Sequence, residues 1–569
     1  MPPHLNHLGN DLCRGLLLFK EARPLGPAGL KWLHVQVSNL MGNDKVSFEE
    51  RVQFTKEHLH EVYDSADDPL NGRQWWLKAD SPWQCLAACY ELTAAMRSPD
   101  PCEYLSRLPI HQDGTCNGLQ HYAALGGDAL GARQVNMTPI DRPQDVYSGV
   151  AQKVQEITTQ DALQGVAEAQ LMQHRITRKL VKQTVMTNTY GVTFIGAKKQ
   201  VMNRLKEAKA SEKNLEPLTD DQLNACAIYI TKKIFESMGF MFSGARGIQK
   251  WLNRTAALIA RSIPPEDIPK DELELSEKLG EMGLFKGVSF GNEALAEAVG
   301  SQDTLLEASE DTLLSSVLKD QEEESLETVL DPKEPEYTSE ADLVMDIAKR
   351  KPVFIPSEKR APVKMTSVIW TTPLGLPVVQ PYRNWKNQVV CDCHARLNVQ
   401  VDTVLQSVSV QDPSIPSPVN PQKQSTAFPP NFIHSLDASH MMLSAIDCQR
   451  QGITYASVHD SYWTHACDVD TMASTLRDAF IRLHSEDIMG RLKSELEERY
   501  STHRLLVKIE IKDAQQSEEI AQFLKSQGKR AHARRIKTVQ AWVPLVLDML
   551  PPRGSFSIDS VKDAPYFFH

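Results

Sequence analysis

The run from Arg178 to Gly191, RKLVKQTVMTNTYG, constrains this chain most. On a helix, Arg178, Lys182, Met186 and Tyr190 follow one another every four residues, and each step turns about 400°, so the row stays on one side. Two cations followed by an aromatic ring suit a nucleoside triphosphate, because the cations can meet phosphate oxygens beside the sugar and base. Alone, this pattern is more typical of a solvated helix face, so independent support is needed.

A second motif places a carboxylate between a predicted strand and a predicted helix. Residues 109–121 read PIHQDGTCNGLQH, in which a short apolar run leads to Asp113, Gly114 and small polar residues. These small residues open the predicted helix. Taken alone, Asp113 is equally well interpreted as a helix N-cap.

A third motif places a carboxylate at a predicted sharp turn. Residues 455–464 read YASVHDSYWT, and two β-prone runs flank His459, Asp460 and Ser461. Taken alone, Asp460 is an ordinary turn residue. We expect His459 to orient the turn, since a histidine beside an aspartate is more often a structural hydrogen-bonding group than a base.

The order of these motifs supports one combined hypothesis. Asp113 and Asp460, if they lie side by side, could bind two magnesium ions. One ion would activate an attacking oxygen, and both would bind the charged phosphate, as in nucleotidyl transfer. A carboxylate, a basic helix and a second carboxylate in this order arise by chance far less often than any one of them.

The three motifs resemble those of single-subunit, phage-type RNA polymerases, of the branch found in mitochondria and some plastids. The Asp113 segment is similar to the first palm motif of that family, residues 178–191 to its fingers helix, and residues 459–461 to its second palm motif. Other similar stretches are PPHLNHLGNDLCRG from residue 2, DSPW from residue 80, WTTPLGLPVVQPY from residue 370 and PPNFIHSLDASH from residue 429. The resemblance covers most of 1–262, then 364–502 and the extreme C-terminus.

The resemblance implies roles for the charged residues. Asp113 and Asp460 would hold the two Mg²⁺ ions, with the backbone carbonyl of Gly114 as a further contact. Arg178 and Lys182 would hold the incoming triphosphate, and Lys182 would also protonate or stabilise the leaving pyrophosphate.

Four further residues receive roles from the same resemblance. Tyr190 would close against the incoming base pair and help to select a ribose, and Gly191 would let the chain pass close to the template base. His434 would touch the minor-groove side of the nascent pair. Lys45, in the run GNDKV, would be an additional phosphate contact.

RNA rather than DNA synthesis follows from departures from the related DNA polymerases. Those enzymes carry a Glu shortly after the first palm Asp, which blocks the ribose 2′-hydroxyl, whereas residues 114–117 read GTCN here. Tyr190 stands where DNA enzymes often have Phe, and Ser461 stands where they commonly have Glu. A DNA polymerase of the related family is therefore the disfavoured alternative.

The fold implied is a right hand of the α+β class, mostly helical, with palm and fingers around a small antiparallel sheet. The N-terminal domain and much of the thumb are expected to be absent, because Met1 is followed at once by a family motif. The expected division is a first palm part over 1–168, fingers over 169–262, an acidic and largely disordered insertion over 263–363, a strand region with a promoter-specificity hairpin over 364–428, and a second palm part with a C-terminal extension over 429–569.

The charge of the chain is unevenly distributed. The 569 residues, too many for one core, carry a net charge of −11. Residues 263–350 contain 24 acidic and 7 basic residues, a net charge of −17, which leaves +6 for the rest of the chain. A mildly basic body suits contact with a phosphate backbone. The acidic insertion, with a short amphipathic helix expected near 311–318, is interpreted as a tolerated surface insertion, or alternatively as a docking segment for a basic partner.

Several shorter patterns complete the predictions. Alternation over 397–410 predicts a β-hairpin, and residues 505–511 (LLVKIEI) predict a strand. The ten cysteines show no CxxC pair. The CDCH run at 391–394 could bind a metal, but its three clustered ligands favour free thiols, and Cys85 and Cys89 are expected in the core. Basic residues over 525–537 could meet nucleic acid or the acidic insertion, or form a solvated face. The ending PYFFH at 565–569 resembles the aromatic C-terminus of the family, which folds back towards the active site.

The predicted function is therefore DNA-directed RNA polymerase, with Mg²⁺ as cofactor. The expected partners are template and promoter DNA, nascent RNA, ribonucleoside triphosphates and a mitochondrial transcription initiation factor. Apolar runs are too short for membrane insertion. Mitochondrial localisation follows from the resemblance, since no targeting peptide is visible. The alternative is a truncated relative that binds a DNA/RNA hybrid without efficient synthesis.

Overall fold

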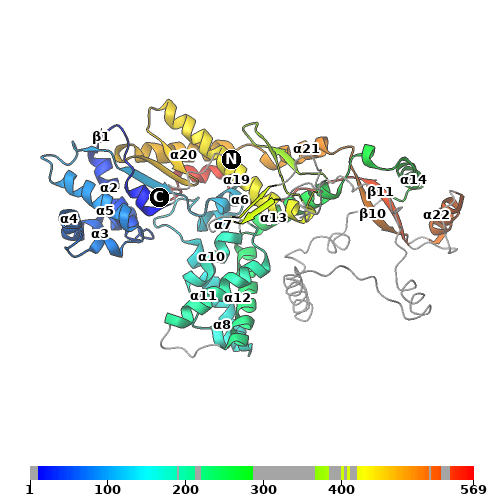
Figure 1. Ribbon diagram of the computed structural model, residues 1–569, viewed down its shortest axis with the longest axis horizontal. Coiled ribbons are helices and arrows are strands. Elements are labelled where there is room, and N and C mark those ends of the chain that lie inside the picture. The colour runs from blue at the N-terminus through cyan, green and yellow to red at the C-terminus, as the bar shows by residue number, and fades with distance from the viewer. Residues whose placement is uncertain are drawn as a thin grey trace.

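Figure 1 shows an elongated body from whose middle a bundle of helices projects. The computed structural model describes residues 10–188, 191–211, 219–285, 366–383, 399–402, 407–410, 419–511, 514–526 and 538–569. Within this part of the chain, helices predominate and all strand pairs are antiparallel. The expected α+β class, mostly helical with small antiparallel sheets, is confirmed.

The N-terminal end of the body is a helical unit with an aromatic core. It contains α1 (Asp11–Gly15), β1 (Arg23–Pro24), α2 (Gly26–Leu40), α3 (Phe48–Glu57), α4 (Leu59–Asp67), η2 (Trp75–Lys78), α5 (Pro82–Met96) and β2 (Leu105–Ser106). Helix α3 starts at a capping box, in which Ser47 and Glu50 satisfy each other's backbone N–H groups. Trp32, Trp75 and Trp76 are buried in this unit together with Cys85 and Cys89, so the core prediction for the two cysteines is confirmed.

The central sheet joins segments that lie far apart in the sequence. Its order is β3 (Pro109–Asp113), β9 (Ser461–His465) and β8 (Ala456–Val458). Strands β8 and β9 form a hairpin that leaves His459 and Asp460 to make the turn, and His459 has a φ of +55°. The sharp turn predicted at 459–461 is confirmed.

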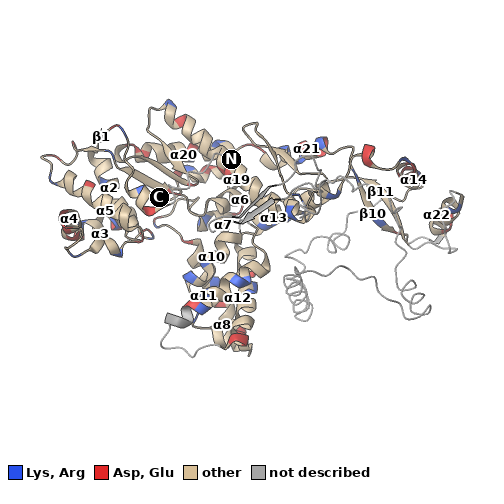
Figure 2. Ribbon diagram, viewed as in Figure 1, with Lys and Arg blue, Asp and Glu red and all other residues tan. Residues whose placement is uncertain are grey.

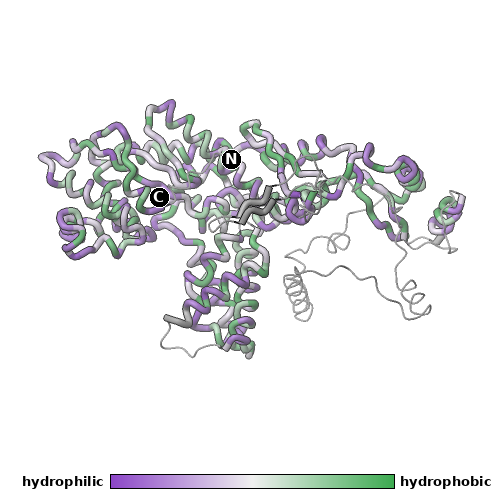
Figure 3. The backbone as a smooth tube through the Cα atoms, viewed as in Figure 1, coloured by the Kyte–Doolittle hydropathy of each residue, from purple (hydrophilic) through white to green (hydrophobic). Residues whose placement is uncertain are grey.

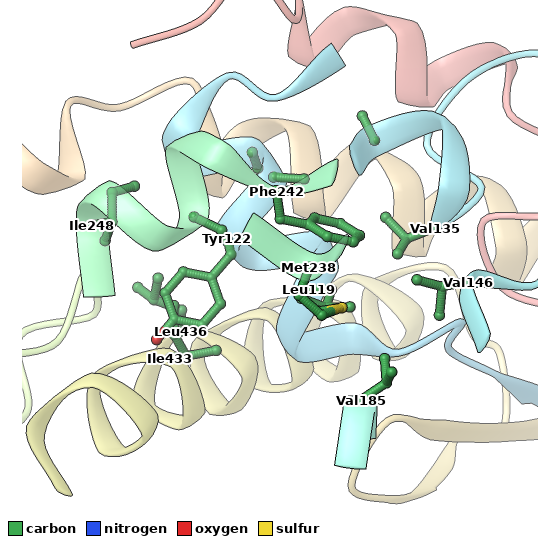
Figure 4. Close-up of a cluster of buried hydrophobic side chains, with 14 of the residues drawn as sticks. Leu119, Tyr122, Val135, Val146, Val185, Met238, Phe242, Ile248, Ile433 and Leu436 are labelled. Carbon is green, nitrogen blue, oxygen red and sulfur yellow. The ribbon is translucent and has the colours of Figure 1, made fainter. Parts of the chain in front are cut away.

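A set of helices packs together beside this sheet, and α20 contacts β9 directly. The helices are α6 (Asn117–Gly126), α7 (Ala129–Gln134), α13 (Ser243–Arg261), α19 (Pro421–Arg450) and α20 (Val469–His484), the last preceded by η4 (Ala466–Asp468). Leu119 and Tyr122 of α6 meet Ile248 of α13 and Ile433 and Leu436 of α19 in one buried cluster (Figure 4). This packing places the start of α6 and the middle of α19 beside the carboxylate-bearing ends of the strands.

The projecting bundle consists of α8 (Val146–Leu163), α9 (Ala167–Met172), α10 (Arg178–Asn188), α11 (Phe194–Ser211) and α12 (Asp220–Met241). Helix α10 buries Leu180, Val181, Thr184 and Val185 and leaves the cationic side chains on its other side. Hydrophobic and hydrophilic positions therefore alternate along the bundle (Figure 3). Lys and Arg residues recur on its helices (Figure 2).

The far end of the body carries a two-stranded sheet with helices beside it. These elements are η3 (Pro265–Asp267), α14 (Lys270–Glu281), α21 (Ile488–Arg499), β10 (Arg504–Glu510), α22 (Ala514–Ser526) and β11 (Thr538–Pro544). The remaining short elements are the pair β4 (Ile369–Thr371) and β5 (Pro377–Val379), the pair β6 (Val399–Asp402) and β7 (Ser407–Val410), and η5 (Ile558–Asp563). The strand predicted at 505–511 and the hairpin predicted within 397–410 are both confirmed.

Residues 263–285 differ from the expected disordered insertion. Helix α14 buries Leu275 and Leu279 against β11, and the indole N–H of Trp542 donates to Glu272 Oε2 at 3.0 Å. The acidic composition concealed apolar positions at helical spacing, so this part of the expected insertion is a packed helix and not disordered, while the boundary at 263 stays a prediction. Residues 286–365, with the helix expected near 311–318, lie outside the described residues, as do the cysteines of the CDCH run and residues 527–537 of the basic patch.

No helix in the described ranges is both long and apolar enough to cross a bilayer.

Candidate active site

The register of the central sheet brings the two predicted carboxylates together. Asp113, the last residue of β3, lies opposite Ser461, the residue that follows Asp460. The Gly114 N–H donates to the Asp460 carbonyl at 3.0 Å, which ties the two backbone segments together. The expectation that Asp113 and Asp460 lie side by side is confirmed in position, although their roles remain predictions.

The interpretation of Asp113 as a helix N-cap is wrong. Helix α6 begins at Asn117, and its N-cap residue is Cys116, whose φ of +55° belongs to the left-handed region. The Asp113 side chain caps no helix and is exposed, so it is available to a ligand. Asp460 is half-buried in its turn.

A glycine is needed at position 114 because neighbouring side chains lie close to its Cα, and not because of its backbone angles. A Cβ at this position would lie 2.9 Å from the ring of Phe568 and 3.4 Å from the Asp460 Cβ. Any side chain would therefore push the C-terminus or the second carboxylate away. The absence of a side chain lets Phe568 and Asp460 lie close to the backbone of Gly114.

A third carboxylate, that of Asp437, adds to the negative potential at Asp460. Burial, followed by the charges of Asp437 and Asp113, raises the pKa of Asp460 to about 7. Burial also raises the pKa of Asp437, on α19, to about 6, and Asn117 Nδ2 donates a hydrogen bond to it. Like charges that the fold forces together are stabilised by a cation, and carboxylate and carbonyl oxygens are ligands that Mg²⁺ prefers.

The donor set fits magnesium only when a substrate completes it. Asp113, Asp460 and the Gly114 carbonyl provide two carboxylates and one backbone oxygen. The described ranges contain no group of three or more His, Cys, Asp or Glu side chains that could hold a metal by themselves. Mg²⁺ commonly binds through one or two carboxylates together with water and substrate phosphates, so this sparse set is chemically suitable.

The cationic residues of α10 form the second part of the site. Arg178 makes a two-point contact with Asp145. Its Nε donates to Oδ2 at 2.7 Å and its Nη2 donates to Oδ1 at 3.2 Å. The guanidinium carbon lies 5.4 Å from the ring centre of Tyr147, and Lys182 Nζ lies 5.9 Å from the same ring. The prediction that the two cations lie on one side of a helix is confirmed.

Lys45 lies on a half-exposed loop, with its Nζ 2.8 Å from Asp44 Oδ2. The pKa of Asp145 lies below its ordinary value, although burial by itself would raise it. The hydrogen bond from Arg178 lowers this pKa most, and the charge of Lys45 also contributes. Lys45 therefore belongs to the same electrostatic neighbourhood as the start of α10. Its assignment as a phosphate contact remains a prediction.

Gly191 lies where the bundle approaches α19. Gly191 has a φ of +72°, and a Cβ there would lie 3.1 Å from the Thr426 carbonyl of α19, so a larger residue would be both strained and crowded. His434 is half-buried on α19. Tyr190 lies outside the described residues.

The C-terminus folds back onto the first carboxylate segment, as expected. Phe568 forms an antiparallel bridge with Gly114, and the His569 N–H donates to the Asp113 carbonyl at 3.1 Å. The Phe568 ring lies 5.0 Å from the Tyr462 ring. Burial, Arg51 and Lys45 lower the pKa of His569 to about 3, which keeps this terminal ring neutral.

Sequence reasoning missed four residues that shape the site: Arg51, Asp145, Tyr147 and Asp437. Asp437 lay within a stretch already matched to the family, so only its role was overlooked. Asp145 carries the ordinary signal of an N-cap, and its side chain does accept from the Ser148 N–H at the start of α8. Its second partner, Arg178, becomes visible only in three dimensions.

Comparison with known proteins agrees with this geometry. A family model described as DNA-dependent RNA polymerase matches residues 23–569. The chain is 44% identical over 510 residues to the mitochondrial DNA-directed RNA polymerase of Neurospora crassa, covering 90% of this chain and 31% of that protein. It is 40% identical over 565 residues to the mitochondrial DNA-directed RNA polymerase of Schizosaccharomyces pombe, covering 99% and 38%.

A mammalian relative gives the same result. The chain is 37% identical over 572 residues to the mitochondrial DNA-directed RNA polymerase of Mus musculus, covering 100% of this chain and 35% of that protein. The chain thus spans 31–38% of the length of these three relatives. Because the family match runs through both strands that carry the paired aspartates, and the identity extends over nearly the whole chain, this chain belongs to the DNA-dependent RNA polymerase family.

Proposed function

We propose that this chain is the catalytic part of a DNA-directed RNA polymerase that transcribes the mitochondrial genome. It would transfer ribonucleotides from NTPs to an RNA 3′ end, as a DNA template directs. The observation that carries the proposal is the placement of Asp113 and Asp460 at adjoining strand ends, on segments separated by most of the chain. Family membership and the names of the relatives support it.

The carboxylates would act as the metal-binding half of the site. Asp113 and Asp460, with the Gly114 carbonyl, would hold two Mg²⁺ ions. When bound, magnesium would lower the pKa of the RNA 3′-hydroxyl and neutralise charge on the reacting phosphate. The chain itself would hold the two carboxylates together through the β3–β9 register, and Asp437 would add negative potential behind Asp460.

The cations would act as the triphosphate-binding half. Arg178, Lys182 and Lys45 would meet phosphate oxygens, and Lys182 would stabilise or protonate the leaving pyrophosphate. Asp145 would hold the Arg178 guanidinium in orientation through its two-point contact. The Tyr147 ring, which lies near both α10 cations, would limit where the phosphates can bind.

Residues beyond the charged centre would govern base and sugar. Tyr190 would close on the incoming base pair and favour ribose, Gly191 would permit close passage of the template, and His434 would touch the minor groove of the nascent pair. The β6–β7 hairpin would contact promoter DNA, and an initiation factor would assist opening. These roles accompany the proposed palm over 1–168 and 429–569 and fingers over 169–262.

A second candidate is a relative that binds a DNA/RNA hybrid without efficient synthesis. The chain spans 31–38% of three relatives named as polymerases, so the activity of those whole proteins does not by itself assign synthesis to these residues alone. Both candidates predict binding to a primer–template, and only the first predicts extension.

Extension of a preassembled RNA primer on a DNA template, with Mg²⁺ and rNTPs, tests the proposal. The scaffold bypasses promoter opening. We compare the chain with Asp460→Asn and with Asp478→Asn, a matched change at an exposed aspartate of α20. Extension that survives Asp478→Asn and disappears with Asp460→Asn supports the polymerase. Scaffold binding without extension supports the second candidate, and extension that survives both changes contradicts the metal assignment.

A further inference from the structure

A buried arginine lies beneath the loop that carries Lys45. Arg51, on α3, has no exposed surface. Its Nε donates to the Val46 carbonyl at 3.0 Å, and its terminal nitrogens donate to Asn39 Oδ1 at 2.9 Å and to the Asp44 carbonyl at 2.8 Å. Lys45 therefore lies between two residues whose carbonyl groups are held by one guanidinium.

This arrangement is costly, because the three acceptors of Arg51 are all neutral oxygens. Burial lowers the pKa of Arg51 to about 10, although the charge of Asp44 opposes this shift, because neutral acceptors only partly replace the lost hydration. A planar group with five donors can hold several points of a loop at once, which an ammonium group cannot do. The burial of Arg51 is unfavourable by itself, and what it provides is a fixed geometry for the loop that carries Lys45.

The same guanidinium also contacts the C-terminal tail. Its central carbon lies 5.0 Å from the ring centre of Phe48 and 6.0 Å from that of Tyr566. The two rings stack with centres 4.7 Å apart. Beyond Tyr566 the tail ends at His569, whose N–H donates to the Asp113 carbonyl. One side chain thus connects the Lys45 loop with a tail that reaches the first carboxylate.

We propose that Arg51 is a positioning residue that couples docking of the C-terminal tail to the placement of Lys45, and thereby sets the affinity for the incoming triphosphate. The proposal rests on the proposed function, since it takes Lys45 to meet phosphate. Arg51 is fully buried, so it acts through Lys45 and does not touch the substrate.

The first test measures equilibrium binding of a fluorescent rNTP to the chain on a primer–template whose 3′-deoxy end prevents reaction. Arg51→Lys keeps the charge but loses the fork of donors, so Kd should rise about 5- to 10-fold. On an extendable primer, kcat at saturating rNTP should stay within about twofold. Arg97→Lys, a matched change at an exposed ion pair with Asp67, should leave both quantities unchanged.

A double variant separates positioning from general damage. In a Lys45→Ala background, Arg51→Lys should add less than about twofold to Kd, because the two residues act in series. Effects that multiply would overturn the proposal, as would a fall in kcat with no change in Kd. An unchanged Kd in Lys45→Ala alone would also overturn it.

A third variant keeps the test decisive if Arg51→Lys does not fold. Tyr566→Leu leaves Arg51 in place and removes one of its two ring contacts, so Kd should rise in the same direction, and an unchanged Kd would contradict the coupling. The binding measurement is independent of turnover. If the chain binds rNTP in a manner that depends on Lys45 and Arg51 but never extends a primer, the proposed function fails and this inference survives.

Discussion

The two halves of the candidate site are built in opposite ways. The carboxylate half is made by backbone pairing, since Asp113 and Asp460 adjoin through the β3–β9 register and the Gly114 hydrogen bond. The cationic half is made by one helix face, on which the half-exposed Arg178 and the exposed Lys182 lie a turn apart. The first half forces like charges together, whereas the second pairs its arginine with Asp145. We infer that the carboxylate half tolerates almost no change and that the cationic half responds in graded steps.

The largest expected effect is loss of turnover in Asp113→Asn. Removal of one of the two charges proposed to hold Mg²⁺ should lower kcat by about three orders of magnitude or more. The same change should leave the thermal midpoint unchanged or raised without Mg²⁺, because a repulsion with Asp460 is relieved. Single-turnover extension and thermal unfolding measure the two quantities. Activity within about tenfold of the parent would break the contrast between the halves.

Gly114→Ala tests whether the carboxylate half is rigid. The new Cβ would lie 2.9 Å from the Phe568 ring, so the tail or the Asp460 turn must shift. We expect activity to fall by about 100-fold and the free energy of unfolding by about 1–3 kcal/mol. Gly196→Ala, on α11, provides the control, because a Cβ there would lie 3.2 Å from Val192 Cγ2 and 3.3 Å from Thr193 Oγ1, well away from the C-terminus and the carboxylates. Equal losses in both variants would contradict the rigidity argument.

Acid should weaken the packing beneath the carboxylates. Burial lowers the pKa of His440 to about 4 and that of His484 to about 3, and the two rings belong to a buried cluster with His121. Since the folded-state pKa values lie below the ordinary 6.5, their stabilising contribution is complete above pH 6.5. This contribution is lost as the pH falls towards 4, because these histidines bind protons in the unfolded chain and stay neutral in the folded one.

At pH 5 each such histidine should cost about 2 kcal/mol of unfolding free energy relative to pH 7.5. Urea unfolding at both pH values measures this change. His440→Gln should reduce the pH dependence, whereas His60→Gln, at an exposed ring of α4, should not. A pH dependence that is the same in all three proteins would show that the buried cluster is not its source.

The smallest effect is expected in the cationic half. Arg178→Gln should raise the KM for rNTP about tenfold, because the proposed phosphate contact of Arg178 and its orientation by Asp145 are lost. The effect should shrink at high salt, since this side chain is partly exposed. Lys179→Gln, an exposed position on the same helix, should change KM little. A loss as severe as that of Asp113→Asn would remove the distinction between the halves.

Much of the local structure could be predicted from patterns among neighbouring residues in the sequence. The cationic row on α10 follows from helical spacing, the Asp460 turn from two flanking β-prone runs, and the β10 strand from alternating apolar residues. Helix α14 was missed because its acidic composition obscured the buried positions Leu275 and Leu279. The resemblance then supplied roles that no local pattern contains.

Tertiary structure alone decided which of these local pieces meet. Spacing predicts that Asp113 ends a strand, but only the register opposite Ser461 places it beside Asp460. The Asp145 partner of Arg178, the Asp437 charge behind Asp460 and the Arg51 contact with the tail all join segments distant in the chain. Helical periodicity and turn preferences depend on a few neighbouring residues, so the sequence determined them by itself. Pairing, burial and the resulting pKa values depend on the whole packed core, and so they appear only in the folded molecule.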